Sequence, residues 1–415
     1  MKVLLINTVC GSGSVGKITA DIYHTLKEAG EDGIILYGRN DAPAQVNAVK
    51  IGSKSDFYRH ALLGVVTGKG GFGSGKITES IIEKIKEEQP DVIHLHNIHG
   101  FYVQIEKLFS YLKEAAIPVV WTLHDCWSFT GHCAYFNYAG CDKWKQGCGS
   151  CPQHRQVYPY SLLDYSKKAY QRKKKAFQGV KNLTIVTPSH WLAKLVEQSI
   201  LSEYPVKVIP NGIELQNFNE KADSKAFRKK YGIQDKFMIL GVANVWEKRK
   251  GLEYFVNLAN LLKAAGENDK INDKNTVIVL IGISKKDKKK LPESIIALER
   301  TNGAKELAAA YRAADVYVNA TLEDNFPTTN IEALACGTPV VTFDTGGSAE
   351  ALNESCGLVT KEKSAKGIYD ALLCLKNHPL NRQECLKRGR EYDKNKRFEE
   401  YITLYRKIIE KNAGE

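Results

Sequence analysis

The chain has 415 residues, of which 43% are hydrophobic and 26% are charged, so its composition is that of a folded globular protein and not of a disordered one. Its 59 Lys and Arg residues against 47 Asp and Glu residues give a formal charge of +12, which leaves nucleic acid, anionic lipid and phosphorylated small molecules open as partners. No apolar run approaches the roughly 20 residues of a transmembrane helix, and the N-terminus has no signal-peptide pattern, so we expect a cytoplasmic protein.

Short apolar runs alternate with amphipathic stretches along the whole chain. Strands are expected at residues 2–7, 33–38, 92–97, 118–125 and 183–189, and then at 236–243, 276–282, 314–320, 339–344 and 356–360. Helical spacing between them is clear at Lys17–Ala29 and Thr78–Glu88. Because the strands are continuously apolar, they indicate parallel sheets covered on both faces. The sequence therefore predicts an α/β fold of two doubly wound, Rossmann-like domains.

Turn residues between the two series mark the domain boundary. Pro205, Pro210 and the pair Asn211-Gly212 interrupt the chain there. We expect an N-terminal domain at 1–205 with a Cys-rich excursion at 126–154, and a C-terminal domain at 206–394. Residues 395–415 are expected to form a helix that joins the N-terminal domain.

A glycine-rich loop follows the first expected strand and opens a helix. Gly11, Gly13 and Gly16 place backbone N–H groups where a phosphate or a sugar could bind. The segment nearly forms the P-loop of a kinase or NTPase, but Ile18 stands where the Mg²⁺-binding Ser or Thr is required. A tight turn with no ligand is the remaining alternative.

Histidines gather at the ends of two expected strands in the first half. His94, His96 and His99 could bind a metal or form a structural group at the sheet edge. His124 and Asp125 follow the next strand, and an adjacent imidazole and carboxylate can position a hydroxyl or share a proton. Alternatively, Asp125 caps the turn that follows it.

Four cysteines lie within nineteen residues just after this strand. The sequence favours a structural zinc site with Cys133, Cys141, Cys148 and Cys151 as ligands. Reduced thiols that only pack together, or a redox pair at the C-x-x-C, are the alternatives.

Two carboxylates lie eight residues apart in the second half. Between Asp324 and Glu332, Asn330 is expected to cap a short helix over Ile331–Cys336, with Glu332 in its first turn. Ionised carboxylates at a buried strand end need partners, and the vicinal hydroxyls of a sugar can supply them. Helix capping is the alternative.

Basic residues form three clusters. Lys248, Arg249 and Lys250 stand just before a helix, where they could bind a diphosphate or be a solvated cluster. The runs at 167–175 and 285–290 are expected to be solvated faces that could also favour an anionic membrane surface.

In combination, these segments resemble the family 4 glycosyltransferases, retaining enzymes of the GT-B fold with two domains facing a central cleft. The resemblance rests on the Gly-rich loop, "DVIHLHN", "TLHD", "TPSHWLAKLV", "VKVIPNGIELQNF", "RKGLEYF", "ELAAAYRAADVYVNA" and "DNFPTTNIEALACGTPVV" followed by "TGG". The Cys-bearing segment resembles bacterial enzymes that build exopolysaccharide or O-antigen chains.

The resemblance implies a nucleotide-diphosphate-sugar donor held mainly by the second domain. Glu332 matches the acid that contacts the ribose, Asp324 stands where the family's first Glu contacts the sugar, and Lys250 matches the diphosphate-binding lysine. Asn244 stands near the position of the family's companion arginine, which Arg249 is expected to replace. The implied catalytic residues are His124, Asp125 and Asp324, and the implied donor-binding residues are Gly11, Gly13, Gly16, Asn244, Arg249, Lys250, Phe326, Pro327, Thr328, Thr329 and Glu332.

The implied reaction is retaining transfer of a sugar to a hydroxyl of a glycan or a lipid-linked saccharide. It requires no catalytic metal, so zinc would be structural only. The protein could lie at the inner face of the plasma membrane, and nucleic acid is not expected as a partner. A P-loop-like kinase or NTPase, and a zinc-bearing basic nucleic-acid-binding protein, are the alternative functions.

Overall fold

The computed structural model describes residues 1–265 and 276–414, and the chain divides into two compact units. The first unit comprises residues 1–210 and 395–415, and the second comprises 211–394. The division lies five residues after the expected boundary because strand β7 (Val206–Val208) pairs with β6 in the first sheet. No described helix is long and apolar enough to cross a membrane.

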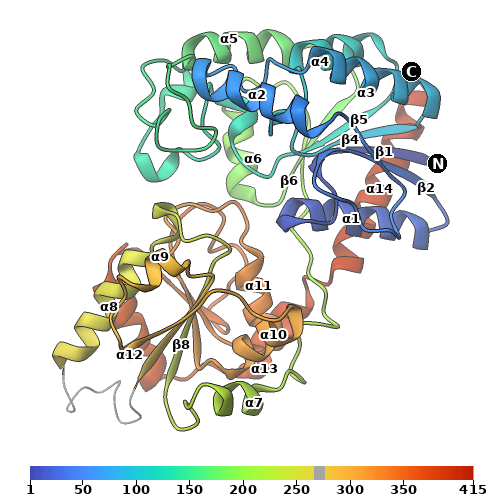
Figure 1. Cartoon of the computed structure of the whole chain (residues 1–415). Helices are drawn as coiled ribbons and strands as arrows, with labels where there is room; N and C mark the ends of the chain where they lie inside the picture. The colour runs from blue at the N-terminus through green and yellow to red at the C-terminus, as the bar shows by residue number, and fades with distance from the viewer. Residues whose placement is uncertain (266–275, 415) are drawn as a thin grey trace. The chain divides into compact units, whose positions relative to one another are not determined.

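The first unit is built on one parallel sheet of seven strands in the order β3-β2-β1-β4-β5-β6-β7 (Figure 1). Its strands are β1 (Lys2–Val9), β2 (Asp32–Arg39), β3 (Ala48–Lys50), β4 (Val92–Leu95), β5 (Val119–Thr122), β6 (Leu183–Thr187) and β7. Its α-helices are α1 (Gly13–Glu28), α2 (Lys54–Thr67), α3 (Gly75–Glu88), α4 (Ile105–Glu114), α5 (Ser166–Phe177), α6 (His190–Glu197) and α14 (Lys394–Ala413). The Cys-rich excursion carries the short 3-10 turns η1 (Trp127–Phe129), η2 (Asn137–Ala139) and η3 (Lys143–Lys145).

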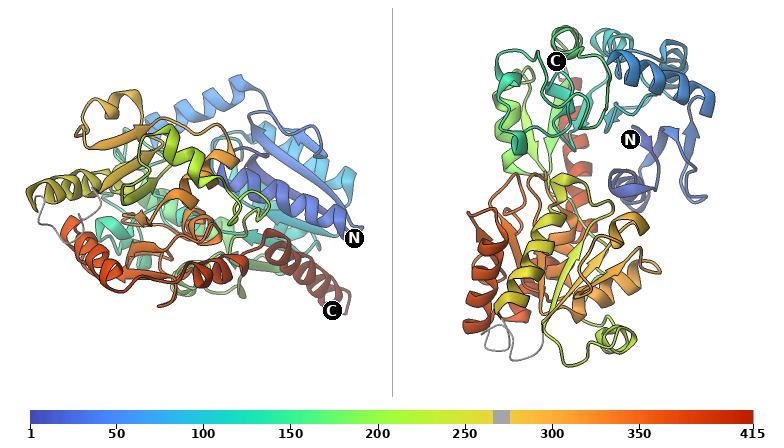
Figure 2. Two further views of the ribbon diagram at one scale, coloured as in Figure 1. Left: turned by 90° about the horizontal axis from the view of Figure 1, so that it is seen from below. Right: turned by 60° about the vertical axis from the view of Figure 1, so that its left-hand side comes forward.

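Apolar residues cover this sheet on both faces. Alternate residues of β1 enter two separate cores, because successive strand side chains point to opposite faces. On one face, Val3 and Leu5 pack with α1 and with Tyr405 of α14. On the other, Leu4 and Ile6 belong to the core formed with α3, α4, α5 and α6. The views of Figure 2 show α14 running beside the strands of this unit.

The second unit repeats the same plan with a parallel sheet of six strands, in the order β10-β9-β8-β11-β12-β13. Its strands are β8 (Met238–Val242), β9 (Val277–Ile281), β10 (Ile295–Leu298), β11 (Val316–Asn319), β12 (Val340–Phe343) and β13 (Gly357–Thr360). Its helices are the 3-10 turn η4 (Lys248–Lys250) and α7 (Ser224–Lys230), α8 (Leu252–Ala265), α9 (Lys285–Lys288), α10 (Ala304–Ala313), α11 (Thr328–Ala335), α12 (Ala365–Asn377) and α13 (Arg382–Arg390). The expected doubly wound α/β fold is confirmed in both units.

Strand order reverses beside β1 in the first sheet and beside β8 in the second. In open parallel sheets, ligands bind beyond the carboxyl ends of the strands at such a switch point. The loops after β1, β4 and β5, and those after β8, β11 and β12, therefore contain the parts of each unit best placed for chemistry.

Candidate active site

A basic turn lies at the carboxyl end of the second sheet. After β8 the chain passes through Asn244, which is exposed, and then forms η4. Gly251 ends this turn with a φ of +72°, and a Cβ there would lie 2.2 Å from the carbonyl oxygen of Ala320. The backbone N–H of Leu322 donates to the carbonyl of Arg249 at 2.8 Å. The basic turn is thereby fixed against the segment that follows β11.

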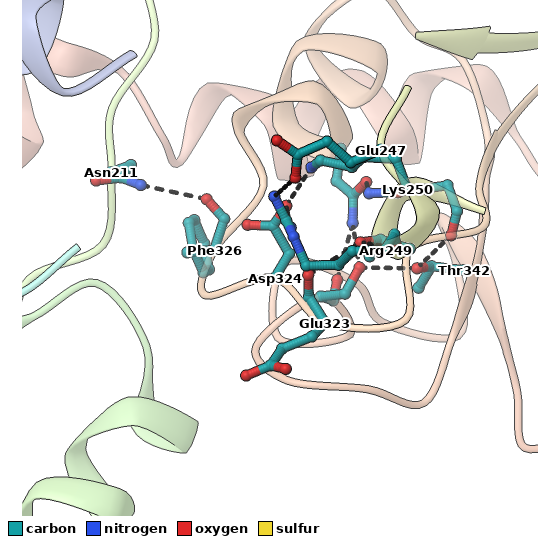
Figure 3. Close-up of polar contacts among 12 residues, drawn as sticks. Asn211, Glu247, Arg249, Lys250, Glu323, Asp324, Phe326 and Thr342 are labelled. Atoms are coloured by element: carbon teal, nitrogen blue, oxygen red, sulfur yellow. Dashed lines mark hydrogen bonds and ion pairs between the residues drawn. The ribbon is translucent and has the colours of Figure 1, made fainter. Parts of the chain in front are cut away.

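Asp324, on that segment, is held by two cations (Figure 3). Lys250 Nζ lies 2.5 Å from Asp324 Oδ2, and an Arg249 guanidinium nitrogen lies 3.5 Å from the same oxygen. Burial raises the pKa of Asp324, but Lys250 and Arg249 outweigh that effect and hold the pKa below its usual value. Glu247 Oε2 also lies 3.9 Å from an Arg249 guanidinium nitrogen, so the two cations face two carboxylates, and an anionic ligand would compete with these carboxylates for Lys250 and Arg249.

A glycine turn after β12 supports Asp324 from the other side. Gly346 has a φ of +56°, and a Cβ there would lie 2.1 Å from the carbonyl oxygen of Asp324. The N–H of Gly347 donates to that carbonyl at 2.9 Å. Only glycine fits this close approach, which is the physical reason for glycine at position 346. Arg249 donates a further hydrogen bond to the carbonyl of Glu323 at 2.6 Å.

Helix α11 begins three residues earlier than expected. Pro327, not Asn330, occupies the N-cap position, so the prediction for Asn330 is wrong. Asn330 is buried, where it accepts a hydrogen bond from Asn319 at 2.7 Å and donates to the carbonyl of Ser348 at 2.8 Å. Its side-chain amide is thus hydrogen-bonded to β11 and to the segment after β12, and it is not available to cap the helix. Glu332 consequently lies in the second turn, not the first.

The remaining predicted residues of the second unit surround this helix start. Glu332 is half-buried and accepts a hydrogen bond from the hydroxyl of Tyr311 at 3.0 Å. Phe326 is buried, and its carbonyl accepts from Asn211 at 3.2 Å. Thr328 and Thr329 are half-buried in the first turn of α11, where backbone N–H groups lack helical partners. Asp324, Lys250 and Arg249 are thus in direct contact, and the others lie at the same sheet edge.

In the first unit, the glycine-rich loop joins β1 to α1 as expected. Gly11 and Gly13 have φ values of +69° and +65°, in the region that favours glycine. A Cβ on Gly16 would lie 2.9 Å from a methyl carbon of Val9, so this glycine allows the helix to pack closely on the strand. The loop has the form of a strand–helix turn with backbone N–H groups at a helix N-terminus.

Three neighbouring histidines lie at the ends of β4 and β5: His94 and His96 are buried and His124 is half-buried. His96 Nδ1 lies 3.0 Å from His124 Nε2, and their rings stack with centroids 5.3 Å apart. His94 lies beside His96 and hydrogen-bonds to Thr122 at 2.8 Å and to the hydroxyl of Tyr405 at 2.6 Å. Burial lowers the pKa of His124 to about 4 and the pKa values of His94 and His96 well below the usual value. These imidazoles are therefore neutral at physiological pH.

Asp125 pairs with His99 and not with its neighbour His124. Its Oδ2 lies 2.9 Å from His99 Nε2, while its Oδ1 accepts from the N–H of Trp127 at 2.9 Å. Burial raises the pKa of Asp125, but His99 and the Trp127 N–H outweigh that effect and lower it. Asp125 thus caps the following turn and also holds an imidazole. A small cavity of about 10 Å³, with walls that include His96, His99, His124, Asp125 and Ser128, lies among these groups.

Comparison with protein families accounts for both units. The model described as "Glycosyltransferase Family 4" matches residues 15–217, and the model described as "Glycosyl transferases group 1" matches 223–392. Together they match most of the chain.

The chain is a family 4 glycosyltransferase. The resemblance noted in the sequence is thus confirmed. This glycosyltransferase is 24% identical over 339 residues to a putative colanic acid biosynthesis glycosyl transferase, WcaC, of Escherichia coli, covering 77% of each chain. It is 25% identical over 302 residues to a putative teichuronic acid biosynthesis glycosyltransferase, TuaC, of Bacillus subtilis, covering 72% of this chain and 64% of the other.

Solved structures of low sequence identity share its architecture. Sucrose-phosphate synthase from Thermosynechococcus elongatus has a TM-score of 0.69 at 14% identity, with 98% of each chain covered. HepE from Anabaena, solved in complex with UDP, has a TM-score of 0.64 at 13% identity, with 97% of this chain and 99% of the other covered. The glycosyltransferase therefore has the expected GT-B fold.

Two features singled out in the sequence can be placed in the structure of this glycosyltransferase. Ile18 is 5% exposed and belongs to the core around β1, so the first loop cannot supply the Mg²⁺ ligand of a P-loop enzyme. Among the described residues, no group of three or more His, Cys, Asp or Glu side chains is arranged to hold a metal, and Cys133, Cys141, Cys148 and Cys151 form no disulfide; the zinc site stays a prediction. Burial raises the pKa of Cys148 to about 11, which favours its neutral thiol.

The sequence did not assign two functional candidates that the glycosyltransferase places beside its predicted residues. His96 contacts His124, and His99 contacts Asp125. In the sequence, both belong to the histidine group at the end of the preceding strand. The parallel pairing of β4 with β5, in which His94 is in register with Val120, brings the residues that follow β4 close to those that follow β5.

Proposed function

We propose that this glycosyltransferase moves a sugar from a nucleotide-diphosphate-sugar to a hydroxyl of a glycan or lipid-linked saccharide, with retention of anomeric configuration, in bacterial surface polysaccharide synthesis. Names of relatives support the pathway class: colanic acid for WcaC, teichuronic acid for TuaC, and a diphospho-undecaprenol acceptor for a Campylobacter jejuni N-acetylgalactosaminyltransferase. The UDP complex of HepE supports a nucleotide-sugar donor.

The contact of Lys250 and Arg249 with Asp324 is the observation on which this proposal depends. When a sugar is transferred, negative charge develops on the leaving diphosphate, and fixed cations lower the barrier by stabilising it. Lys250 and Arg249 are held by Asp324 and by the carbonyl of Glu323, so they are already oriented before the donor binds. In our proposal these cations supply the charge that a metal ion supplies elsewhere, and catalysis is metal-independent.

Other residues of the second unit would hold the donor. Glu332 would accept hydrogen bonds from the ribose hydroxyls, and Asp324 would accept one from the transferred sugar. The backbone of Phe326, Pro327, Thr328 and Thr329 offers N–H and carbonyl groups at the start of α11, where the helix dipole favours negative charge. Asn244, exposed after β8, would add a neutral donor.

Residues of the first unit would act on the reacting groups. The N–H groups around Gly11, Gly13 and Gly16 would bind phosphate or sugar oxygens, and His124 would contact the donor sugar. Asp125, fixed by the Trp127 N–H, would orient His99 toward a hydroxyl. The proposed step is a front-face transfer through an oxocarbenium-like state, in which the leaving phosphate takes the proton of the acceptor hydroxyl. We place the enzyme in the cytoplasm, with no role for nucleic acid.

Loss of the Glu332 carboxylate should weaken donor binding. Thermal unfolding of the wild type with UDP, GDP, ADP and dTDP sugars should reveal one donor class that raises the midpoint, since a bound ligand stabilises the folded state. For that donor, Glu332→Ala should lower affinity about 10- to 100-fold, because hydrogen bonds to a charged group are removed. The exposed Glu354 of the same unit provides the control Glu354→Ala. Equal affinity in both variants, or stabilisation by none of the donors, would contradict the assignment.

His96 should act as a positioning residue for His124. His96 Nε2 is buried with no hydrogen-bond partner among the described residues, and a bare lone pair costs less there than an unpaired N–H. His96 therefore donates from Nδ1 to His124 Nε2, which leaves the proton of His124 on its Nδ1. His96→Leu should lower kcat about 10- to 30-fold with little change in KM, since a misoriented group costs rate. His96→Asn, which retains an N–H at the Nδ1 position, should recover most of the wild-type kcat. An equal loss of kcat in His96→Leu and His96→Asn would contradict the positioning role of His96.

A further inference from the structure

Arg39, in the first unit, is an arginine whose side chain has no polar partner. It is the last residue of β2 and is half-buried. Among the described residues, its side chain forms no hydrogen bond or ion pair, and its Nε is buried without a partner. A charge that is partly removed from water is costly unless an opposite charge meets it. The other half-buried arginines of the described chain all form hydrogen bonds or ion pairs, and they are Arg172, Arg228, Arg249, Arg312, Arg382, Arg388 and Arg397.

The backbone places Arg39 at the carboxyl end of the first sheet, beside the glycine-rich loop. Arg39 is in register with Val9, the last residue of β1. Asn40 follows with a φ of +64°, which turns the chain sharply at the end of the strand. The side-chain amide of Asn40 donates to Ser12 Oγ at 3.2 Å, so the segment after β2 is joined to the start of α1. Arg39 therefore lies at the edge of the sheet where open parallel folds bind their ligands.

Aromatic rings surround the Arg39 guanidinium on the side of α2 and of the loop after β4. Its Cζ lies 5.4 Å from the ring centroid of Phe57, within the range of a cation–π contact. Phe101 meets the rings of both Phe57 and Tyr158 edge-on, with centroids 6.1 Å apart in each pair. Phe101 has a φ of +67°, which residues other than glycine rarely adopt. The fold thus keeps a strained backbone at the residue that joins these rings.

Tyr158 connects Arg39 to the histidine site. Its ring centroid lies 5.9 Å from that of His99, which is hydrogen-bonded to Asp125. Burial raises the pKa of Tyr158 to about 12, and the positive charge of Arg39 opposes this rise, so that charge lies close enough to act on the phenol. Within the part of the chain that the structure describes, the Tyr158 hydroxyl forms no hydrogen bond. It can therefore bind a ligand beside Arg39.

Acidic side chains on the neighbouring segments do not neutralise Arg39, because each is bound to another side chain. They are paired as Asp41 with Lys50 at 3.5 Å, Asp56 with Arg59 at 2.5 Å and Asp125 with His99 at 2.9 Å. An anionic ligand would therefore meet Arg39 without displacing a carboxylate of the described chain.

We propose that Arg39 and the Tyr158 hydroxyl bind an oxyanion carried by the acceptor saccharide, an inference that rests on the proposed function. A guanidinium presents parallel N–H groups that match the oxygens of a phosphate or a carboxylate, so a phosphorylated sugar and a uronic acid share the required chemistry. In the proposed function, cations of the second unit bind the donor diphosphate, which leaves this cation of the first unit for the acceptor. A neutral acceptor would leave Arg39 unpaired, so the site selects a charged one.

Modification of the full-length protein by phenylglyoxal, which reacts with guanidinium groups, tests the proposal at Arg39 itself. The probes are glucose 6-phosphate, glucuronate and glucose, which share a sugar ring and carry a phosphate, a carboxylate or a hydroxyl at the same carbon. Peptide mass spectrometry should show that at least one charged probe slows the modification of Arg39 at least about fivefold, and that glucose does not. Arg59, on α2 with 76% of its side chain exposed, is the matched control and should react equally with every probe present.

The two charged probes distinguish the sources of the oxyanion. Protection by glucose 6-phosphate alone indicates a phosphorylated acceptor, protection by glucuronate alone indicates a uronic acid, and equal protection by both supports a site for either oxyanion. Three results would overturn the proposal: no reaction of Arg39 in the free protein, no protection by either charged probe, or equal protection by glucose.

Replacement of Arg39 separates a binding role from a structural one. Arg39→Gln removes no hydrogen bond or ion pair of the described chain, so its unfolding midpoint should fall by less than about 2 °C. A much larger fall would show that Arg39 is structural and would contradict the proposal. The donor-induced rise in the unfolding midpoint should persist in this variant. A donor response without protection of Arg39 would contradict only the acceptor site, and protection without any donor response would contradict only the proposed function.

Discussion

Replacing Lys250 by alanine is expected to lower the kcat/KM of sugar transfer about a thousandfold, the largest single effect we anticipate, because it removes a fixed cation from the leaving diphosphate. Lys250 Nζ lies 2.5 Å from Asp324, and its side chain is only 23% exposed, so water screens it incompletely. In its absence, Asp324 retains only Arg249, at 3.5 Å. Because Glu247 lies 3.9 Å from that same Arg249, the cluster then holds one cation against two carboxylates, which disfavours a diphosphate.

The chain provides close controls for this variant. Lys248 belongs to the same turn but is exposed, so Lys248→Ala should retain nearly full turnover. Lys250→Arg preserves the charge with a different shape and should recover part of the rate. Initial rates across donor concentration, together with thermal unfolding of each variant, separate catalysis from stability. Equal rates for Lys250→Ala and Lys248→Ala would refute the role of Lys250.

The central strands of both sheets could be predicted from the sequence because they are buried on both faces and continuously apolar. The three unpredicted strands, β3, β7 and β10, all lie at sheet edges. Edge strands are short and half-buried: β3 and β7 have three residues each, and Lys207 in β7 is exposed. Their sequences therefore lack the apolar continuity that marks a central strand, and tertiary pairing decides their conformation.

The candidate site could be predicted where its residues are close in sequence or belong to a known motif. Lys250 and Asp324 fall in this class, although their direct ion pair required the fold. The contact of His96 with His124 could not be predicted, because 28 residues separate them and only the register of β4 on β5 brings them together. The predicted N-cap role of Asn330 is wrong because an asparagine near a helix start usually caps the helix, whereas the Asn330 side chain is hydrogen-bonded to Asn319 and Ser348 in the core.

The first unit should lose stability sharply as pH falls below about 6.5, the usual pKa of histidine. Burial lowers the pKa of five of its histidines. The pKa values of His60, His124 and His132 are lowered to about 4, and those of His94 and His96 lie well below the usual value. Between the folded and unfolded pKa values, the unfolded chain binds more protons, so acid favours unfolding. Each such histidine removes about 1.4 kcal/mol of stability per pH unit in that window.

Urea unfolding between pH 7.5 and about pH 4, followed by hydrogen exchange in each unit, measures this loss. The sole histidine in residues 211–394, His378, is exposed, so amides of the second unit should retain protection to lower pH than those of the first. His60→Gln is the sharpest variant: His60 Nε2 accepts from the N–H of Gly73 at 3.1 Å, and a glutamine oxygen can replace that acceptor without titrating. In this variant, the slope of the unfolding free energy against pH should correspond to about one fewer proton bound on unfolding. An unchanged slope, or simultaneous loss of protection in both units, would show that buried imidazoles do not control acid unfolding.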